Sequence, residues 1–179
     1  NRGYELKGKT VGIIGYGNMG AAFAEKLAGF DCKVLAYDKY KSGFGNRRVK
    51  EVSLQKLQAE ADVVSLHVPQ TPATLGLMNR NYIRSFKKPF YLINTARGKS
   101  LVTEDLVAAM RDGKILGACL DVLEYEKSSF ENMFTQALPQ AFEYLINSER
   151  VVLSPHIAGW THESNARMAE VIATKIENL

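Results

Sequence analysis

The chain has 179 residues, of which 46% are hydrophobic and 23% are charged, with a formal net charge of +4. This is ordinary for a globular protein of about one domain, and the charge is too small to indicate nucleic-acid binding. No apolar run reaches the ~18 residues of a membrane helix, so no membrane partner is expected. The two distant cysteines, Cys32 and Cys119, argue against a disulfide scaffold or a metal site and fit a cytoplasmic protein.

Apolar runs alternate with helical patterns from the first strand onward. In chain order we expect strand 10–16, helix 18–30, strand 33–38, helix 53–61, strand 62–69, helix 79–86, strand 90–96, helix 104–112, strand 115–122, helix 138–148, strand 151–156 and helix 161–179. Ser53, Asn79 and Thr103 are expected to cap three of these helices. The apolar face of the last helix is formed by Ala166, Ala169, Ile172, Ala173 and Ile176.

The predicted strands are nearly continuous apolar runs rather than alternating ones. Strands that are buried on both faces have this pattern, and the helices between them supply the cover. The sequence therefore predicts an α/β fold with a doubly wound, mostly parallel sheet. Residues 125–150 interrupt the alternation, and we expect one extra helix there, with Pro139 in its first turn.

Three glycines, Gly15, Gly17 and Gly20, lie between the first strand and the first helix in the pattern GxGxxG. Gly15 permits a tight turn, Gly17 lets a pyrophosphate approach the backbone, and Gly20 lets helix and strand pack closely. The helix N-terminus then offers free N–H groups and a partial positive charge to phosphates. The pattern predicts a dinucleotide site in a Rossmann fold.

Asp38 ends the second predicted strand, where a carboxylate would accept hydrogen bonds from the adenosine ribose. A carboxylate there repels a 2′-phosphate, so NAD is favoured over NADP. The alternative is that Asp38 only caps the strand end. The following stretch, KYKSGFGNRRVK, carries five basic side chains, which either soften this preference or form a solvated loop, as we expect.

Further motifs follow the later strands: HVPQTPATLGLMN, NTARGKSLV, GACLDVLEYE and SPHIAGWTHES. Together with the glycine loop they resemble the D-isomer-specific 2-hydroxyacid dehydrogenases, near the phosphoglycerate and glycerate type, over nearly the whole chain. The resemblance implies hydride transfer between NAD and a small 2-hydroxy or 2-oxo acid, possibly 3-phosphoglycerate. GYGNMG alone also suits imine reductases, but NTARG and SPHIAG argue against that class.

The resemblance also implies site residues. Arg97 matches the arginine that holds the substrate carboxylate, His156 the acid/base histidine, and Glu126 the glutamate that partners it. The positions expected to contact the cofactor are Gly15, Gly17, Asn18, Met19, Gly20, Asp38, Val68, Pro69, Thr95, Ala96, Arg97, Asp121, His156 and Gly159. Of these, Asp121 matches the aspartate near the nicotinamide carboxamide.

The chemistry independently asks for these residue types. An arginine binds a carboxylate with two parallel hydrogen bonds, and a histidine exchanges a proton near neutral pH. Glu126 is followed by Lys127 instead of the usual proline, and the span to His156 is longer than usual, so Glu124 or Glu131 are alternative partners.

Three other residues are ambiguous. We expect His67 to pack near the cofactor edge and His162 to lie on the surface at the start of the last helix. Trp160 either walls the nicotinamide pocket or packs elsewhere.

The family's enzymes have two domains, and no substrate domain is recognised here. We expect residues 1–179 to be a single NAD-binding domain from a two-domain enzyme, with little or no turnover by itself. The family commonly forms homodimers through this domain, so a homodimer is expected. The alternative function is an NAD-sensing, corepressor-like interaction module.

Overall fold

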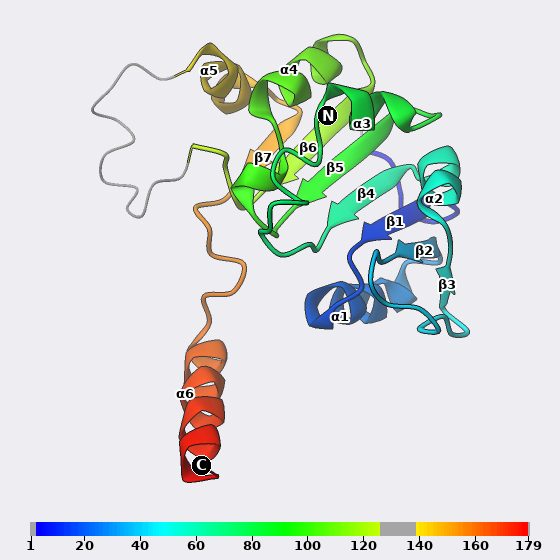
Figure 1. Cartoon of the computed structure of the whole chain (residues 1–179). Helices are drawn as coiled ribbons and strands as arrows, with labels where there is room; N and C mark the ends of the chain where they lie inside the picture. The colour runs from blue at the N-terminus through cyan, green and yellow to red at the C-terminus, as the bar shows by residue number, and fades with distance from the viewer. Residues whose placement is uncertain (1–2, 126–138, 179) are drawn as a thin grey trace.

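The computed structural model describes residues 3–125 and 139–178. Its centre is one seven-stranded sheet in which every pair of neighbours is parallel (Figure 1). The strands are β1 (Thr10–Ile14), β2 (Lys33–Tyr37), β3 (Val49–Glu51), β4 (Val63–Leu66), β5 (Phe90–Asn94), β6 (Ile115–Leu120) and β7 (Val151–Leu153). Their order across the sheet is β3-β2-β1-β4-β5-β6-β7. This arrangement confirms the predicted doubly wound α/β fold.

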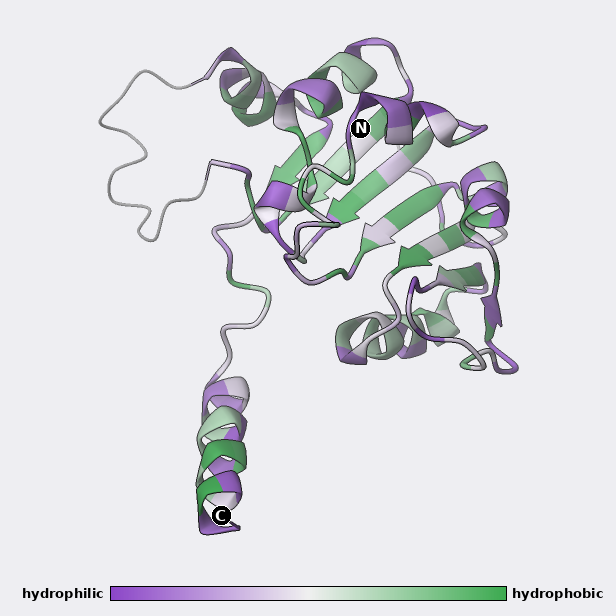
Figure 2. Ribbon diagram, in the orientation of Figure 1, coloured by the Kyte–Doolittle hydropathy of each residue, from purple (hydrophilic) through white to green (hydrophobic). Residues whose placement is uncertain are grey.

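Helices cover the two faces of the sheet unequally. They are α1 (Asn18–Lys26), α2 (Leu54–Glu60), α3 (Arg80–Ser85), α4 (Thr103–Arg111), α5 (Gln140–Asn147) and α6 (His162–Glu177), with 3₁₀ turns at Leu27–Gly29 and Gly98–Ser100. One face packs against α1, and the buried side chains of the other face pack against α2 to α5. Figure 2 shows the apolar residues concentrated along the strands and on the inner sides of these helices.

The strand runs are apolar because both of their faces are buried. All five residues of β1 are buried, as are all four of β4. Leu66 and Leu92 face the α2–α5 side with no exposed surface, whereas Ile13 and Ala36 face α1. This two-sided burial is what the continuous apolar pattern indicated.

Two of the predicted caps are confirmed and one is wrong. The Ser53 side chain accepts a hydrogen bond from the third backbone amide of α2, and the Asn79 side chain accepts hydrogen bonds from two backbone amides of α3. Thr103, however, is already helical, and its N–H donates to Glu124 Oε2 at 2.7 Å. The first amide of α4 therefore finds its hydrogen-bond acceptor on a side chain from another loop, and such a distant contact cannot be predicted from the local sequence.

One sheet face is open at its β6–β7 end. Cys119 of β6 is exposed although it lies within the strand, and Val152, its register partner in β7, is 64% exposed. Helix α6, whose apolar face was predicted, extends away from the sheet and has no buried residue (Figure 1). Within the described residues, none of the helices combines the length and apolar character needed to cross a bilayer.

Candidate active site

Most of the predicted site residues gather at one edge of the sheet. Because all strands are parallel, their carboxyl ends point to the same edge (Figure 1). The order reverses between β1 and β4, which are neighbours although two strands separate them in sequence. Ligands of doubly wound sheets bind in the crevice at such a reversal. The glycine turn follows β1 at this position.

The glycine turn has the conformation that its sequence predicted. Gly15 has φ +94°, and a Cβ there would lie 2.6 Å from the carbonyl oxygen of His67. A Cβ on Gly20 would collide with the carbonyl oxygen of Gly15, so α1 packs directly on the turn. A Cβ on Gly17 would meet no atom within 4 Å. Gly15 and Gly20 are thus required by the fold, whereas Gly17 faces open space.

The N-terminus of α1 is suited to an anion. Gly17 is its N-cap, no side chain accepts a hydrogen bond at this cap, and the first turn contains no acidic residue. Asn18 and Met19 are exposed beside it. The first amides and the helix dipole therefore point toward the space above Gly17. This arrangement fits a pyrophosphate, as the sequence predicted.

Asp38 lies directly after β2 and faces the same turn. Its Oδ2 accepts from the N–H of Tyr16 at 2.7 Å, and its Oδ1 accepts from Tyr40 and Lys41 at 2.8 and 2.9 Å. Burial raises the pKa of the Asp38 carboxyl, but the three amide donors and the nearby Lys41 ammonium outweigh this and hold the pKa below its ordinary value. The carboxylate is therefore ionised and fixed, and Oδ2 keeps a second lone pair for a hydroxyl donor.

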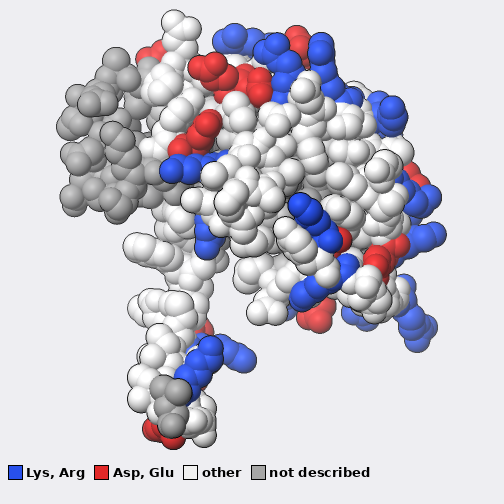
Figure 3. Space-filling view, viewed as in Figure 1, with Lys and Arg blue, Asp and Glu red and all other residues white. Residues whose placement is uncertain are grey.

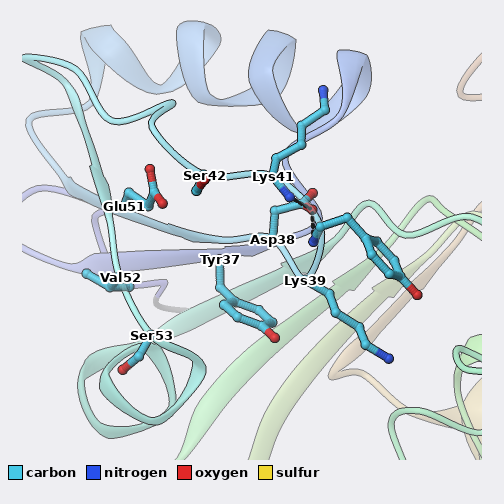
Figure 4. A pocket seen from close by; sticks show the side chains of 9 residues that line it. Tyr37, Asp38, Lys39, Lys41, Ser42, Glu51, Val52 and Ser53 are labelled. Atoms are coloured by element: carbon cyan, nitrogen blue, oxygen red, sulfur yellow. Dashed lines mark hydrogen bonds between the residues drawn. The ribbon is translucent and has the colours of Figure 1, made fainter.

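A hollow of about 580 Å³ opens beside Asp38 (Figure 4). Lys39 and Lys41 extend from it in different directions, and Glu51 lies across it from Asp38. Its lining is Tyr37, Asp38, Lys39, Tyr40, Lys41, Ser42, Glu51, Val52 and Ser53. Two carboxylates and two ammonium groups thus border the region where the adenosine ribose was predicted.

The residues after β4 pack against the glycine turn. Val68 Cγ1 would lie 3.2 Å from a Cβ on Gly15, and Pro69 is exposed at the crevice. The His67 ring contacts the Phe23 ring of α1 and forms a hydrogen bond of 2.9 Å to Ser65 Oγ through Nε2. Burial lowers the pKa of His67 to about 4, so the imidazole is neutral at pH 7. His67 thus joins β4 to α1, and its place at the edge of a bound cofactor stays a prediction.

The turn after β5 presents Arg97 at the surface. Asn94 is fully buried, accepts from the N–H of Ala96 and donates to the carbonyl oxygen of Arg97, which fixes the turn. Arg97 is exposed and donates from Nη1 to the Ala96 carbonyl oxygen at 2.6 Å, and Thr95 is also exposed. Sequence reasoning missed the role of Asn94, although a polar residue ending an apolar strand was an available signal.

Asp121, after β6, fastens the segment that carries His156. Its Oδ1 accepts from Ser154 Oγ at 2.6 Å and from the Ile157 N–H, and its Oδ2 accepts from the Ala158 N–H. Burial raises the pKa of Asp121, but these donors and the charge of His156 outweigh burial and hold the pKa below its ordinary value. The predicted cofactor-side aspartate is thus occupied in holding this loop.

The histidine itself has an unusual backbone. His156 has φ +56°, a left-handed conformation that costs a side chain of its size some strain. It is exposed, like Gly159 and Trp160, the last being 80% exposed. Among the residues that the structure places, Trp160 therefore packs against no core, and His162 is on the surface at the first position of α6, as predicted.

The loops after β5 and β6 touch, but the predicted glutamate is outside the part of the chain that the structure describes. A Cβ on Gly98 would collide with the carbonyl oxygen of Leu123, so the two loops pack backbone to backbone. Glu124 Oε2 is held by the start of α4. Glu126 and the alternative Glu131 lie outside the described residues. Within the described residues, no group of three or more His, Cys, Asp or Glu side chains is arranged to hold a metal ion.

Charged side chains on the face in view do not form one basic stripe. Figure 3 shows Lys and Arg side chains mainly around the periphery of this face, with acidic groups among them and a broad uncharged region between. This distribution is that of an ordinary solvated surface.

Comparison with known proteins identifies the fold and the motifs. The family model described as D-isomer specific 2-hydroxyacid dehydrogenase, NAD binding domain, matches residues 1–158. The glyoxylate reductase of Thermofilum pendens is 41% identical over 177 residues, covering 97% of this chain and 49% of its own length. The chain thus spans about half the length of the curated relatives it matches.

Solved structures similar to this chain come from the same family. The NAD-complexed D-isomer specific 2-hydroxyacid dehydrogenase from Lactobacillus delbrueckii ssp. bulgaricus has a TM-score of 0.86 at 34% identity, over 96% of this chain and 53% of the other. The D-lactate dehydrogenase of Aquifex aeolicus, complexed with NAD and lactic acid, has a TM-score of 0.86 at 36% identity, over 97% and 54%. These relatives give no support to the corepressor-like alternative. The chain belongs to the D-isomer specific 2-hydroxyacid dehydrogenase family and corresponds to its NAD-binding domain.

Proposed function

We propose that this chain is the cofactor-binding half of a dehydrogenase that interconverts a small D-2-hydroxy acid and its 2-oxo acid. The observation that carries the proposal is the open space above Gly17, at the uncapped N-terminus of α1 and beside the fixed carboxylate of Asp38. A pyrophosphate fits the first feature and a ribose the second. Bound NAD supplies the hydride acceptor, and NADH the donor.

The remaining cofactor contacts follow the other strands. Beside the glycine turn, Asn18 and Met19 would contact the pyrophosphate, and Val68 and Pro69 the adenosine half. Thr95, Ala96 and Gly159 would lie toward the nicotinamide. Asp121 would act on that side chiefly through the loop it holds.

Two exposed side chains would act on the substrate. Arg97 uses one guanidinium N–H on its own turn, and its other donors suit a bidentate contact with the substrate carboxylate. His156 would take the hydroxyl proton in oxidation and return it to the oxygen in reduction. Glu126 would favour the charged imidazole and orient it. Glu124 is less suited to that role because its Oε2 accepts from Thr103.

The substrate class is a short 2-oxo acid. The names of the relatives support this, since they include a glyoxylate reductase and an enzyme complexed with lactic acid. 3-Phosphoglycerate belongs to the same chemical class. We also propose a cytoplasmic protein that forms a homodimer through this domain. Because half of the crevice that orients the acid would come from another domain, we expect the 179-residue chain to turn over little substrate.

Two glycine variants test the cofactor site. Gly17→Ala and Gly29→Ala each add a methyl group where no atom lies within 4 Å, but only Gly17 faces the proposed pyrophosphate. We expect Gly17→Ala to keep the wild-type melting temperature and to weaken NADH binding about tenfold in a fluorescence titration, whereas Gly29→Ala binds normally. Equal affinity of both variants, or no NADH binding by the wild-type chain, would contradict the proposal.

The catalytic roles need the complete enzyme. Arg97→Lys retains the charge but loses the planar fork, and we expect KM for the 2-oxo acid to rise at least about tenfold. His156→Gln is expected to lower kcat by about 10²–10⁴-fold without changing the affinity for NADH. An unchanged kcat in the His156 variant would remove this residue from the mechanism.

A further inference from the structure

An aromatic contact joins the β2–β3 loop to the glycine turn. Tyr16, between the first two glycines, stacks on Phe44, with ring centroids 4.4 Å apart and planes inclined by 21°. Tyr16 is buried, and Phe44 is partly buried against the same core cluster. Stacked rings in this geometry stabilise the contact by more than the burial of their apolar area alone would. The loop predicted to be merely solvated therefore packs on the cofactor turn.

Glu51, the last residue of β3, holds Phe44 in place. Its Oε2 accepts from the N–H of Phe44 at 2.9 Å, a bond strengthened by the carboxylate charge. The next residue, Gly45, passes so close that a Cβ there would lie 3.4 Å from the Cβ of Glu51. In Figure 4 the Glu51 side chain points toward the loop near Ser42. The position of Phe44 is thus set by the sheet and not by the loop alone.

Asp38 links the same two segments a second time. One of its oxygens accepts from Tyr16 in the turn, and the other accepts from Tyr40 and Lys41 in the loop. The loop is therefore joined to the turn at its start by Asp38 and in its middle by Phe44. If Tyr16 moves, Oδ2 of Asp38 loses its backbone donor, and the carboxylate is then held only through Oδ1, by the amides of Tyr40 and Lys41.

We propose that Phe44 and Glu51 are positioning residues that set both the affinity for the dinucleotide and the choice between NAD and NADP. They act through Tyr16, whose backbone N–H holds Oδ2 of the Asp38 carboxylate, the oxygen proposed to bind the ribose. A fixed carboxylate repels a 2′-phosphate, whereas a mobile one can turn away from it. The inference rests on the proposed function, because it presupposes a dinucleotide at the turn.

Paired variants test this inference by titration with NADH and NADPH. Phe44→Leu removes the ring, whereas Phe44→Tyr keeps it. Glu51→Ala removes the acceptor, whereas Glu51→Gln keeps an acceptor oxygen. Phe30→Leu is the matched control, because Phe30 is 51% exposed and follows the far end of α1. The melting temperature of each variant is recorded alongside its affinities.

We expect Phe44→Leu and Glu51→Ala to bind NADH about tenfold more weakly and to reduce the preference for NADH over NADPH at least about fivefold. Phe44→Tyr and the control should stay within about twofold of wild type, and Glu51→Gln, which keeps an acceptor but removes a charge beside the hollow, should bind NADH more tightly than Glu51→Ala. A purely structural role would lower the melting temperature and leave the preference unchanged, which would overturn the inference. If Phe44→Leu does not fold, the Glu51 pair decides. Absence of NADH binding by the wild-type chain would overturn the proposed function and this inference together, whereas normal wild-type binding with unchanged variants would overturn the inference alone.

Discussion

Replacing Asp121 by asparagine should loosen the loop that carries His156. Asparagine offers only one acceptor oxygen, and the N–H groups of Ile157 and Ala158 bind different oxygens of Asp121, so at least one of these two loses its partner. A hydrogen bond to a charged group contributes a net of about 1.5–3 kcal/mol to stability. Asp121 is only 4% exposed, so water cannot fully replace the lost hydrogen bond. We therefore expect Asp121→Asn to lower the free energy of unfolding at pH 7 by about 1.5–3 kcal/mol.

Urea denaturation as a function of pH checks this reasoning. Because the folded pKa of Asp121 lies below its ordinary value, its stabilising contribution is complete above the unfolded pKa of about 3.9 and is lost as pH falls through the folded pKa. The difference between wild type and Asp121→Asn should be full at pH 7 and shrink below about pH 4. Asp112→Asn, at the exposed end of α4, is the control. A difference below about 0.5 kcal/mol at pH 7, or one that persists unchanged at pH 3, would refute the argument.

Three further predictions concern stability. Gly20→Ala places a methyl group on the Gly15 carbonyl oxygen, and we expect a loss of about 2 kcal/mol or more, seen in calorimetry as a melting temperature lower by about 4–8 °C. Burial lowers the pKa of His67 to about 4, so between about pH 6.5 and 4 the unfolded chain binds more protons than the folded chain. The free energy of unfolding therefore decreases as the pH is lowered through this range, by at most about 1.4 kcal/mol per pH unit. His67→Asn should abolish this slope in urea titrations, and a retained slope would assign it to another group. Asn79→Ala removes the acceptor of two α3 amides and should cost about 1 kcal/mol in urea denaturation, whereas an unchanged midpoint would deny the cap any net value.

The parts of the fold that depend on local sequence were predictable. The glycine turn was one of them, because φ > 0 at Gly15 and the close approach at Gly20 are requirements that only glycine meets. The parallel sheet was another, since its continuous apolar strands report burial on both faces. Two of the helix caps followed from their side chains in the same way.

The features that sequence reasoning missed depend on contacts between distant segments. β3 has three residues, and only Val49 among them is buried, so its pattern is too short to distinguish from a loop. Thr103 was a reasonable cap, but Glu124 reaches its amide from another loop. Helix α6 was predicted, but none of its residues is buried, because amphipathic spacing indicates that a helix can be covered without indicating what covers it.

The strand order also constrains how quickly the chain can fold. β1 is flanked by β2 and β4, with Thr10 paired to Lys33 and Val11 to Val63. β4 is distant from β1 along the chain, because β2, β3 and α2 lie between them, so the entropy of closing this loop must be lost before the pairing can compensate for it. We expect the centre of the sheet to form late and cooperatively, with refolding on a millisecond-to-second timescale and not in microseconds.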